Sequence, residues 1–461
     1  MKTDVAPVTG LATADGAPAG GRAATLTRLF QTLEEAGIGY CVLHGYDDLP
    51  ARVASDIDCV VSAEVLPRRL ASVLRADRER LGARIVQWFD DAAHFIVLCG
   101  RAPDGEPFFV QLHACADYHL ARRTFYSGEE FLRGRERRNG FWIPAPALEF
   151  ASHLAKKIAK SELTEEAARS LEVLYARDPA GCRQHAVRLW GGEYADLVTA
   201  AAERAEWDTV RQHVVSLRKE QNRRILLRAP LGVARDWLAA AARRVRRVRR
   251  ADRGLNVVLL GPDGSGKSSV VEAVRCGVAP AFVATQRRTF PPALLRRGSG
   301  TNATPHATRE RSFISSVIRA VCYWFVYCTL GHYLLIRPAM ARATLLLHDR
   351  HLVDALVDPK RYRYGGPRWL LRLIWGLVPK PDLVILLDAP AELVQARKQE
   401  VPVEETRRQL AAYRELVSGM RNGRVVDAAM PLREVVAAVE DLILDRLAAR
   451  AAGGLRQEAG R

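Results

Sequence analysis

The stretch Asn256-Val-Val-Leu-Leu-Gly-Pro-Asp-Gly-Ser-Gly-Lys-Ser-Ser269 decides the fold of the chain around it. An apolar, strand-like run leads directly into the pattern Gly-x-x-x-x-Gly-Lys-Ser, and a segment with helical spacing follows. Glycines at positions 261, 264 and 266 let the backbone wrap around a polyphosphate, so that N–H groups and the helix N-terminus point at its oxygens. Because the pattern lies between a strand and a helix, we interpret it as a phosphate-binding loop, the P-loop, and not as a chance Gly-rich turn.

The residues of this loop have distinct predicted roles. Lys267 is expected to reach the β- and γ-phosphates of a bound nucleotide, and the Ser268 hydroxyl is expected to hold Mg²⁺. ATP and Mg²⁺ are therefore the predicted cofactors. The predicted nucleotide-binding residues are Gly261, Asp263, Gly264, Ser265, Gly266, Lys267, Ser268 and Ser269.

Composition restricts the class of protein less sharply. A chain of 461 residues is long enough for two or three domains. The net charge of +17 predicts anionic partners, but it does not distinguish nucleotides, nucleic acid and acidic lipids. The eight cysteines show no Cys-x-x-Cys pair and no zinc spacing, which disfavours a disulfide framework or a structural metal and favours the cytoplasm.

The chain divides by pattern into several regions. Residues 1–23 are rich in Ala, Gly, Thr and Pro without an apolar core, so we expect a disordered leader. Residues 24–146 alternate short apolar runs with turn residues and helical segments, which predicts a small α/β domain. Residues 147–240 have helical spacing throughout, and a basic linker at 241–254 ends this helical middle region.

Residues 255–450 alternate strands and helices. This alternation predicts an α/β fold in which helices cover both faces of a parallel sheet. The apolar run Ala320–Ile336 is slightly short for a bilayer and contains Gly331, so a buried helix is favoured over a membrane span. A flexible tail is expected at 451–461.

Asp349 and Arg350 form a second signal, because an apolar strand delivers them to its carboxyl end, where open α/β sheets bind ligands. Asp349 could hold the Mg²⁺ shell or take a proton from the acceptor, and Arg350 could neutralise an acceptor phosphate. The alternative is an ordinary surface ion pair.

A third signal follows the strand that ends at Asp388. Arg397 and Lys398 come one helical segment later, and positive groups on a mobile flap suit phosphoryl transfer. Arg407 and Arg408 could extend that flap, although a solvated helix face is the favoured interpretation for them.

With these motifs in the same order and at about the same spacing, residues 255 to about 445 resemble the thymidylate-kinase branch of the P-loop nucleoside-monophosphate kinases. The resemblance implies that Asp263 faces the acceptor site, that Arg350 grips the acceptor phosphate and that Arg397 approaches the ATP phosphates.

The segment after Arg350 departs from that family. The family usually carries Ser and an Ala-Tyr-Gln group that help to read thymine, whereas this chain has charged residues there. These charges predict a more polar or more heavily phosphorylated acceptor than thymidylate. The charged residues are Asp354, Asp358, Lys360, Arg361 and Arg363, with Arg287, Arg288 and His306 as further candidates.

The N-terminal region resembles a nucleotidyltransferase signature. Asp56 and Asp58 alternate along a strand, so both carboxylates face one side and could share metal ions. The later strand Phe108–His113 offers no third acid, and Tyr46 stands where that family places a Ser. A degenerate domain kept for binding or structure therefore competes with an active nucleotidyltransferase.

The segment Arg243–Arg250 continues a helix with an apolar side. Such a helix could lie weakly on an anionic membrane surface, or it could be a charged linker. Nucleic-acid binding is disfavoured because no recognisable nucleic-acid fold accompanies the arginines.

The motifs together predict an ATP-dependent kinase that phosphorylates an anionic small molecule, either a nucleoside monophosphate or a sugar phosphate. By analogy it would act in bacterial surface-polysaccharide metabolism, in the cytoplasm or at the inner membrane face. The alternatives are a nucleotide-sensing interaction protein and a bifunctional nucleotidyltransferase. The acceptor and the oligomeric state stay open.

Overall fold

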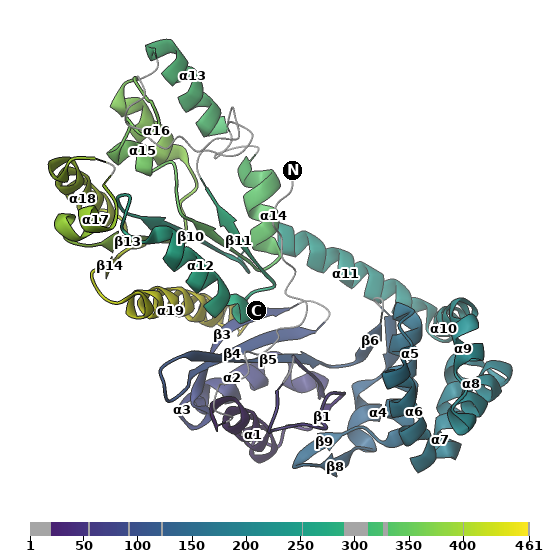
Figure 1. Cartoon of the computed structure of the whole chain (residues 1–461). Helices are drawn as coiled ribbons and strands as arrows, with labels where there is room; N and C mark the ends of the chain where they lie inside the picture. Colours follow the sequence, from purple (N-terminus) through teal and green to yellow (C-terminus); the bar gives the residue numbers. More distant parts are fainter. Residues whose placement is uncertain are drawn as a thin grey trace. The chain divides into compact units, whose positions relative to one another are not determined.

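The computed structural model describes residues 20–53, 56–90, 93–120, 123–250, 252–289, 312–325, 331–399 and 401–459 (Figure 1). Residues 246–450 form one unit, which we call the P-loop unit. Residues 20–245 with 451–459 form the other, which we call the N-terminal unit. His306, a candidate for the acceptor site, lies outside the described residues.

A five-stranded parallel sheet forms the centre of the P-loop unit. Its strand order is β11-β12-β10-β13-β14, and every pairing is parallel. The strands are β10 (Leu255–Leu260), β11 (Ala284–Arg288), β12 (Thr344–His348), β13 (Leu383–Asp388) and β14 (Gly423–Asp427). The central strand β10 is buried along its whole length, as an apolar strand covered on both faces must be. The predicted parallel α/β architecture is confirmed.

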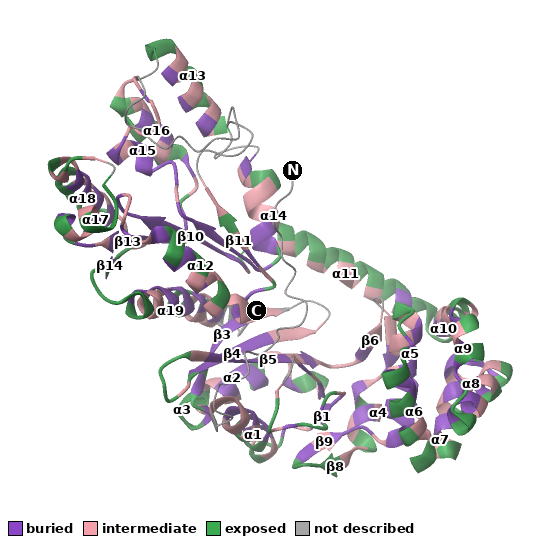
Figure 2. Ribbon diagram, viewed as in Figure 1, coloured by how far each residue is buried: buried purple, intermediate pink, exposed green. Residues whose placement is uncertain are grey.

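Helices cover this sheet, and the buried strands lie between helices with exposed outer faces (Figure 2). Val258 and Leu260 of β10 pack in one core cluster with Tyr413 and Val417 of α18. The helices of this unit are α12 (Lys267–Gly277), η2 (Ala279–Ala281), α13 (Phe313–Trp324), η6 (His332–Ile336), α14 (Arg337–Ala341), α15 (Asp354–Val357), α16 (Arg368–Leu377), α17 (Ala391–Arg397), α18 (Val403–Ser418) and α19 (Leu432–Ala459).

The apolar run Ala320–Ile336 differs from the prediction of one buried helix. Ala320 and Tyr323 of α13 are buried against α16, because only this face of α13 has a packing partner in the described chain. Val321 and Tyr333 are exposed, so the prediction is wrong for these side chains. Residues 326–330 lie outside the described residues. Among the described helices, none is both long and apolar enough to cross a membrane.

A mixed five-stranded sheet forms the centre of the N-terminal unit, in the order β1-β2-β5-β4-β3. Only the pair β2 and β5 is parallel; the other pairs are antiparallel. The strands are β1 (Tyr40–Val42), β2 (Ile57–Val61), β3 (Ala83–Asp90), β4 (His94–Arg101) and β5 (Pro107–Cys115), and two hairpins follow: β6 (Tyr118–Leu120) with β7 (Arg123–Tyr126), and β8 (Glu136–Arg138) with β9 (Phe141–Ile143).

Helices supply the remainder of the N-terminal unit, including the helical middle region that the spacing predicts. Phe150 and Leu154 of α5 belong to the same core cluster as Trp190 of α7. The helices are α1 (Gly20–Glu35), η1 (Ala63–Val65), α2 (Arg68–Ala76), α3 (Arg78–Leu81), α4 (Gly128–Arg133), α5 (Pro146–Lys160), α6 (Glu165–Arg177), α7 (Pro179–Trp190), α8 (Gly192–Arg204), α9 (Asp208–Gln212), α10 (Val214–Arg228) and α11 (Pro230–Arg250).

Three boundaries differ from the sequence prediction. Helix α1 begins at Gly20, within the predicted leader 1–23, and Thr25 anchors its first turns by donating to the Leu81 carbonyl over 2.9 Å. Helix α11 continues through the basic linker as far as Arg250. Helix α19 extends past residue 450 to Ala459, because its buried residues recur every four positions: Val435, Val439, Ile443, Leu447 and Ala451.

Candidate active site

The P-loop joins the end of β10 to the start of α12. Gly261, Gly264 and Gly266 all have positive φ angles, of 144°, 91° and 86°. A Cβ atom at Gly261 would also lie 2.7 Å from Ser265 Oγ and 2.9 Å from the Leu387 carbonyl oxygen. Because no side chain fits there, the loop backbone can stay close to β13 and leave its N–H groups for an anion.

Lys267 is the first residue of α12, and its side chain lies over the loop. The ammonium Nζ donates to the carbonyl oxygens of Gly261 and Pro262 over 2.6 and 2.7 Å. The residue is buried, with 8% of its surface exposed. A phosphate oxygen is a stronger acceptor for an ammonium than a neutral carbonyl, so this position suits a nucleotide phosphate.

One guanidinium group, that of Arg287, contacts both Asp349 and Ser268. Arg287 on β11 donates from Nε to Asp349 Oδ2 over 3.0 Å and from Nη2 to Ser268 Oγ over 3.3 Å. The other carboxylate oxygen, Asp349 Oδ1, is buried and has no hydrogen-bond partner among the described residues. A free carboxylate oxygen near a hydroxyl fits a hydrated Mg²⁺ ion, so Ser268 and Asp349 are the residues that would hold it.

Asp263 of the P-loop lies between two arginines. Arg350, which follows β12, donates from Nη2 to Asp263 Oδ1 over 3.0 Å. Arg361 pairs with the other carboxylate oxygen. Two guanidinium groups on one carboxylate leave an excess positive charge, which suits a phosphate of the acceptor.

Lys267, Asp263 and the two arginines that contact Asp263 line one pocket. Asp349, Ser268 and Arg287 are not among its lining residues. The pocket combines the P-loop with residues after β12 and on α18. The lining residues are Gly261, Pro262, Asp263, Lys267, Arg350, Asp354, Asp358, Arg361, Tyr362, Gln409 and Tyr413.

The carboxylates of the pocket wall are held in hydrogen bonds. Asp354 accepts from the Tyr413 hydroxyl over 2.8 Å and from the His351 backbone N–H over 2.7 Å. Burial raises the pKa of Asp354 above its ordinary value. Asp358 accepts from Gln409 Nε2 over 3.2 Å. These residues therefore offer fixed polar groups to the hydroxyl or amine groups of an acceptor.

Not every predicted residue reaches this pocket. Arg397 donates from Nη1 to the Ala428 carbonyl over 3.1 Å, and neither it nor Lys360 or Arg363 is among the lining residues. The end of α17 nevertheless packs on the loop, since a Cβ at Gly264 would lie 2.8 Å from the Val394 carbonyl oxygen.

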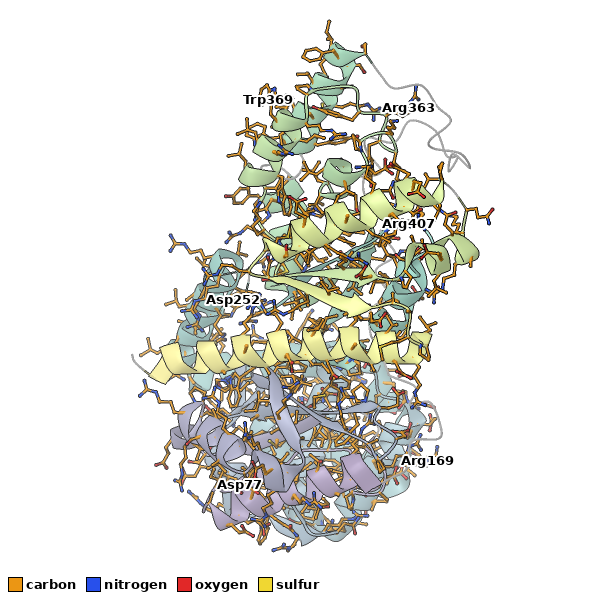
Figure 3. All side chains as sticks on the ribbon, turned by 90° about the vertical axis from the view of Figure 1, so that its left-hand side faces the viewer. Asp77, Arg169, Asp252, Arg363, Trp369 and Arg407 are labelled. Atoms are coloured by element: carbon orange, nitrogen blue, oxygen red, sulfur yellow. The ribbon has the colours of Figure 1, made fainter. Side chains whose placement is uncertain are left out.

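The arginines of α18 lie on a solvated helix face, as favoured from the sequence. Arg407 is exposed (Figure 3). It pairs with Glu392 and Glu404. Arg408 pairs with Glu405.

Sequence reasoning missed four of the lining residues, of which Pro262 lies within the P-loop itself. Gln409 and Tyr413 lie four positions apart on α18 and so face the same side, but no motif marks them. Tyr362 lies between Arg361 and Arg363, and only the charge of these neighbours stands out in the sequence. The helical spacing of Gln409 and Tyr413 is the only sequence signal that could have indicated them.

A second polar cluster lies in the N-terminal unit. His113 Nδ1 lies 3.0 Å from Asp56 Oδ2 and 3.1 Å from Asp58 Oδ1. His44 Nε2 lies 2.8 Å from Asp58 Oδ2, and Lys156 Nζ lies 3.7 Å from the same oxygen. Although burial opposes protonation, the hydrogen bonds to the two carboxylates raise the pKa of His113 to about 9.

Tyr46 contacts Glu149, which lies outside this cluster. Its ring is buried, and its hydroxyl donates to Glu149 Oε2 on α5 over 2.5 Å. The residue is therefore a core side chain.

Comparison with known proteins supports a kinase-like part of the chain. No protein-family model matches. A thymidylate kinase from Thermomicrobium roseum is 34% identical over 122 residues, which are 23% of this chain and 56% of that protein. The chain therefore spans little more than half of that relative. A solved thymidylate kinase from Candida albicans covers 41% of this chain and 91% of its own, with 17% identity and a TM-score of 0.31. The chain thus contains a region similar in sequence to part of a thymidylate kinase.

Proposed function

We propose that the P-loop unit transfers the γ-phosphoryl group of Mg·ATP to a phosphorylated small molecule. The observation that carries this proposal is a single pocket that joins the P-loop Lys267 to Arg350, Asp263 and Arg361. Cations from the P-loop and from the segment after β12 line the same pocket, and two adjacent phosphate groups require more than one cation. The local similarity to a thymidylate kinase supports the same reaction class.

In the proposed reaction an acceptor oxygen attacks the γ-phosphorus. The bond from phosphorus to the β,γ-bridging oxygen breaks, and ADP leaves with the electron pair. Lys267 and the loop N–H groups bind the donor phosphates, while Arg350 orients the acceptor phosphate. Mg²⁺, when bound at Ser268 and Asp349, would neutralise charge on the donor phosphates.

The pocket wall favours an acceptor that carries hydroxyl groups. Asp354, Asp358 and Gln409 present acceptor and donor atoms beside the arginines. A sugar phosphate or a nucleoside monophosphate has a phosphate next to several hydroxyls, and it would satisfy both kinds of group. By analogy with two-part chains of this kind, the reaction would belong to bacterial surface-polysaccharide metabolism.

The test is ADP release by the full chain with ATP, Mg²⁺ and a panel of nucleoside monophosphates and sugar phosphates. We expect one acceptor class to stimulate ADP release, and Arg350→Ala to abolish the stimulation. Arg421→Ala is the matched control, because Arg421 is exposed and outside the pocket. If no acceptor stimulates turnover, or if Arg350→Ala behaves like the control, the proposal is wrong.

The second candidate function is nucleotide sensing without transfer. The observation that favours it is the contact of Arg287 with both Ser268 and Asp349, which Mg·ATP would have to rearrange. Binding could thereby change the position of β11 and a partner surface. Tight ATP binding with slow hydrolysis and no stimulation by acceptors would favour this candidate.

We also propose a weak contact of α11 with anionic membranes. Leu231, Leu238 and Val245 are exposed and lie seven residues apart, so they form one apolar stripe along the helix. The six arginines of Arg243–Arg250 follow on the same helix. An apolar stripe with arginines is typical of helices that lie in a lipid interface.

A further inference from the structure

The carboxylates of Asp56 and Asp58 converge with the imidazole of His113 at one place on the N-terminal sheet. Strands β2 and β5 are parallel neighbours, and Asp58 is the register partner of His113. Paired residues on adjacent strands project to the same face. Asp56 directly precedes β2, and its carboxylate lies 3.0 Å from His113 Nδ1 on that face. The topology therefore brings two carboxylates and one imidazole together.

The distances match the spacing of ligands on one metal ion. One ligand atom from each of the three residues can be chosen so that all lie within 4.8 Å of one another. Two atoms bound to one ion at about 2.1 Å are about 3.0 Å apart at a right angle and about 3.4 Å apart at a tetrahedral angle. The separations from His113 Nδ1 to the two carboxylates, which are hydrogen bonds between these side chains, are 3.0 and 3.1 Å and fall in this range.

The surroundings orient the ligands and leave access. The ring of Phe95 packs on the His113 ring with centroids 4.8 Å apart, and His44 contacts the remaining oxygen of Asp58. Such neighbours fix a ligand in position. Side-chain exposures of 42% for Asp56 and 28% for His113 leave the cluster open on one side for an ion and its waters.

We propose that this cluster, outside the kinase pocket, binds one divalent transition-metal ion through Asp56, Asp58 and His113. Two carboxylates supply the charge that balances a divalent cation. An imidazole nitrogen among the ligands favours Mn²⁺ or Zn²⁺ over Mg²⁺, which is usually bound through oxygen atoms and keeps several waters. This site differs from a pair of Mg²⁺ ions bound by carboxylates alone, and it uses the histidine that stands in place of a third acid.

The test is metal binding to the nucleotide-free full chain. Free Mn²⁺ is counted by electron paramagnetic resonance during titration, and Zn²⁺ and Mg²⁺ are added as competitors. We expect one Mn²⁺ site that Zn²⁺ displaces and that equimolar Mg²⁺ does not. Asp58→Asn and His113→Gln should each weaken it at least about 100-fold, since even loss of an outer neighbour of a ligand costs 10–100-fold.

Two controls make the outcome decisive. His119→Gln removes a histidine of the nearby β6 and should leave the affinity unchanged, and circular dichroism checks that each variant is folded. Asp349→Asn alters the P-loop site and should also leave the Mn²⁺ affinity of the N-terminal cluster unchanged. The proposal is overturned if the full chain binds no Mn²⁺, which would mean that Lys156 and the histidines neutralise the carboxylates, or if Asp349→Asn removes the site while Asp58→Asn keeps it.

Discussion

Replacing Lys267 by Ala should weaken ATP binding while the fold survives. The ammonium lies in a buried position over the loop and donates two hydrogen bonds, which in the complex would go to phosphate oxygens. A hydrogen bond to a charged group contributes about 1.5–3 kcal/mol. At about 1.4 kcal/mol per factor of ten, losing even one of the two interactions weakens binding roughly 10- to 150-fold, so we expect at least this loss.

The assay is isothermal titration of the full chain with Mg·ATP, with thermal unfolding as the check on folding. The buried carbonyls of Gly261 and Pro262 lose their donor in the variant, so we also expect the free energy of unfolding to fall, by about 1–3 kcal/mol for a buried acceptor left unpaired. Arg421→Ala serves as the control for a removed surface cation. A folded Lys267→Ala protein with the affinity of the unmodified chain would refute the phosphate-binding role of the loop.

Three further predictions concern the N-terminal unit and α11. Nucleotidyl transfer should be weak, because His113 and not a third acid faces Asp56 and Asp58; robust Mg²⁺-dependent transfer that Asp58→Asn abolishes would contradict this. Changing the six arginines of α11 to Gln should reduce cosedimentation with anionic vesicles. The binding of the unmodified chain should fall as salt rises, because charges are screened within about 10 Å at 0.1 M. If the Gln variant cosediments as well as the unmodified chain, α11 is only a linker. Burial raises the pKa of Glu149 from 4.5 to about 7, so the folded protein binds a proton at this carboxyl more tightly than the unfolded chain does. The contribution of Glu149 to stability is therefore complete below pH 4.5 and is lost as pH rises through 7, by about 3 kcal/mol. Urea unfolding at pH 5 and pH 8 should show this loss, and Glu149→Gln should remove it; an equal pH dependence in the variant would refute the assignment to Glu149.

Local sequence patterns predicted the centre of the P-loop unit well. The run from Asn256 to Ser269 specifies a buried strand, a Gly-rich loop and a helix within fourteen consecutive residues, so no distant contact is needed to recognise them. The same holds for the strand that ends before Asp349.

Features that depend on distant packing were not predictable in this way. Gln409 and Tyr413 reach the pocket only because α18 packs against β10 and β13. The sequence shows only that the strand predicted to end at His113 lacks a third acid. The parallel pairing of β2 with β5, which the sequence does not reveal, places His113 against both carboxylates. The exposure of Val321 depends on which face of α13 finds a partner, and an apolar run does not reveal this.

The central claim is that the P-loop unit phosphorylates a small phosphorylated acceptor other than thymidylate. Steady-state ADP formation with dTMP and with sugar phosphates tests it most directly. The charged wall with Asp354, Asp358 and Arg361 should discriminate against dTMP, because a site built on hydrogen bonds rejects a substrate that leaves them unpaired by several powers of ten. We expect acceptor-stimulated turnover with a sugar phosphate or another nucleotide, and loss of that turnover in Arg350→Ala. Turnover with dTMP at an ordinary kinase rate of about 1–100 s⁻¹ would contradict the account.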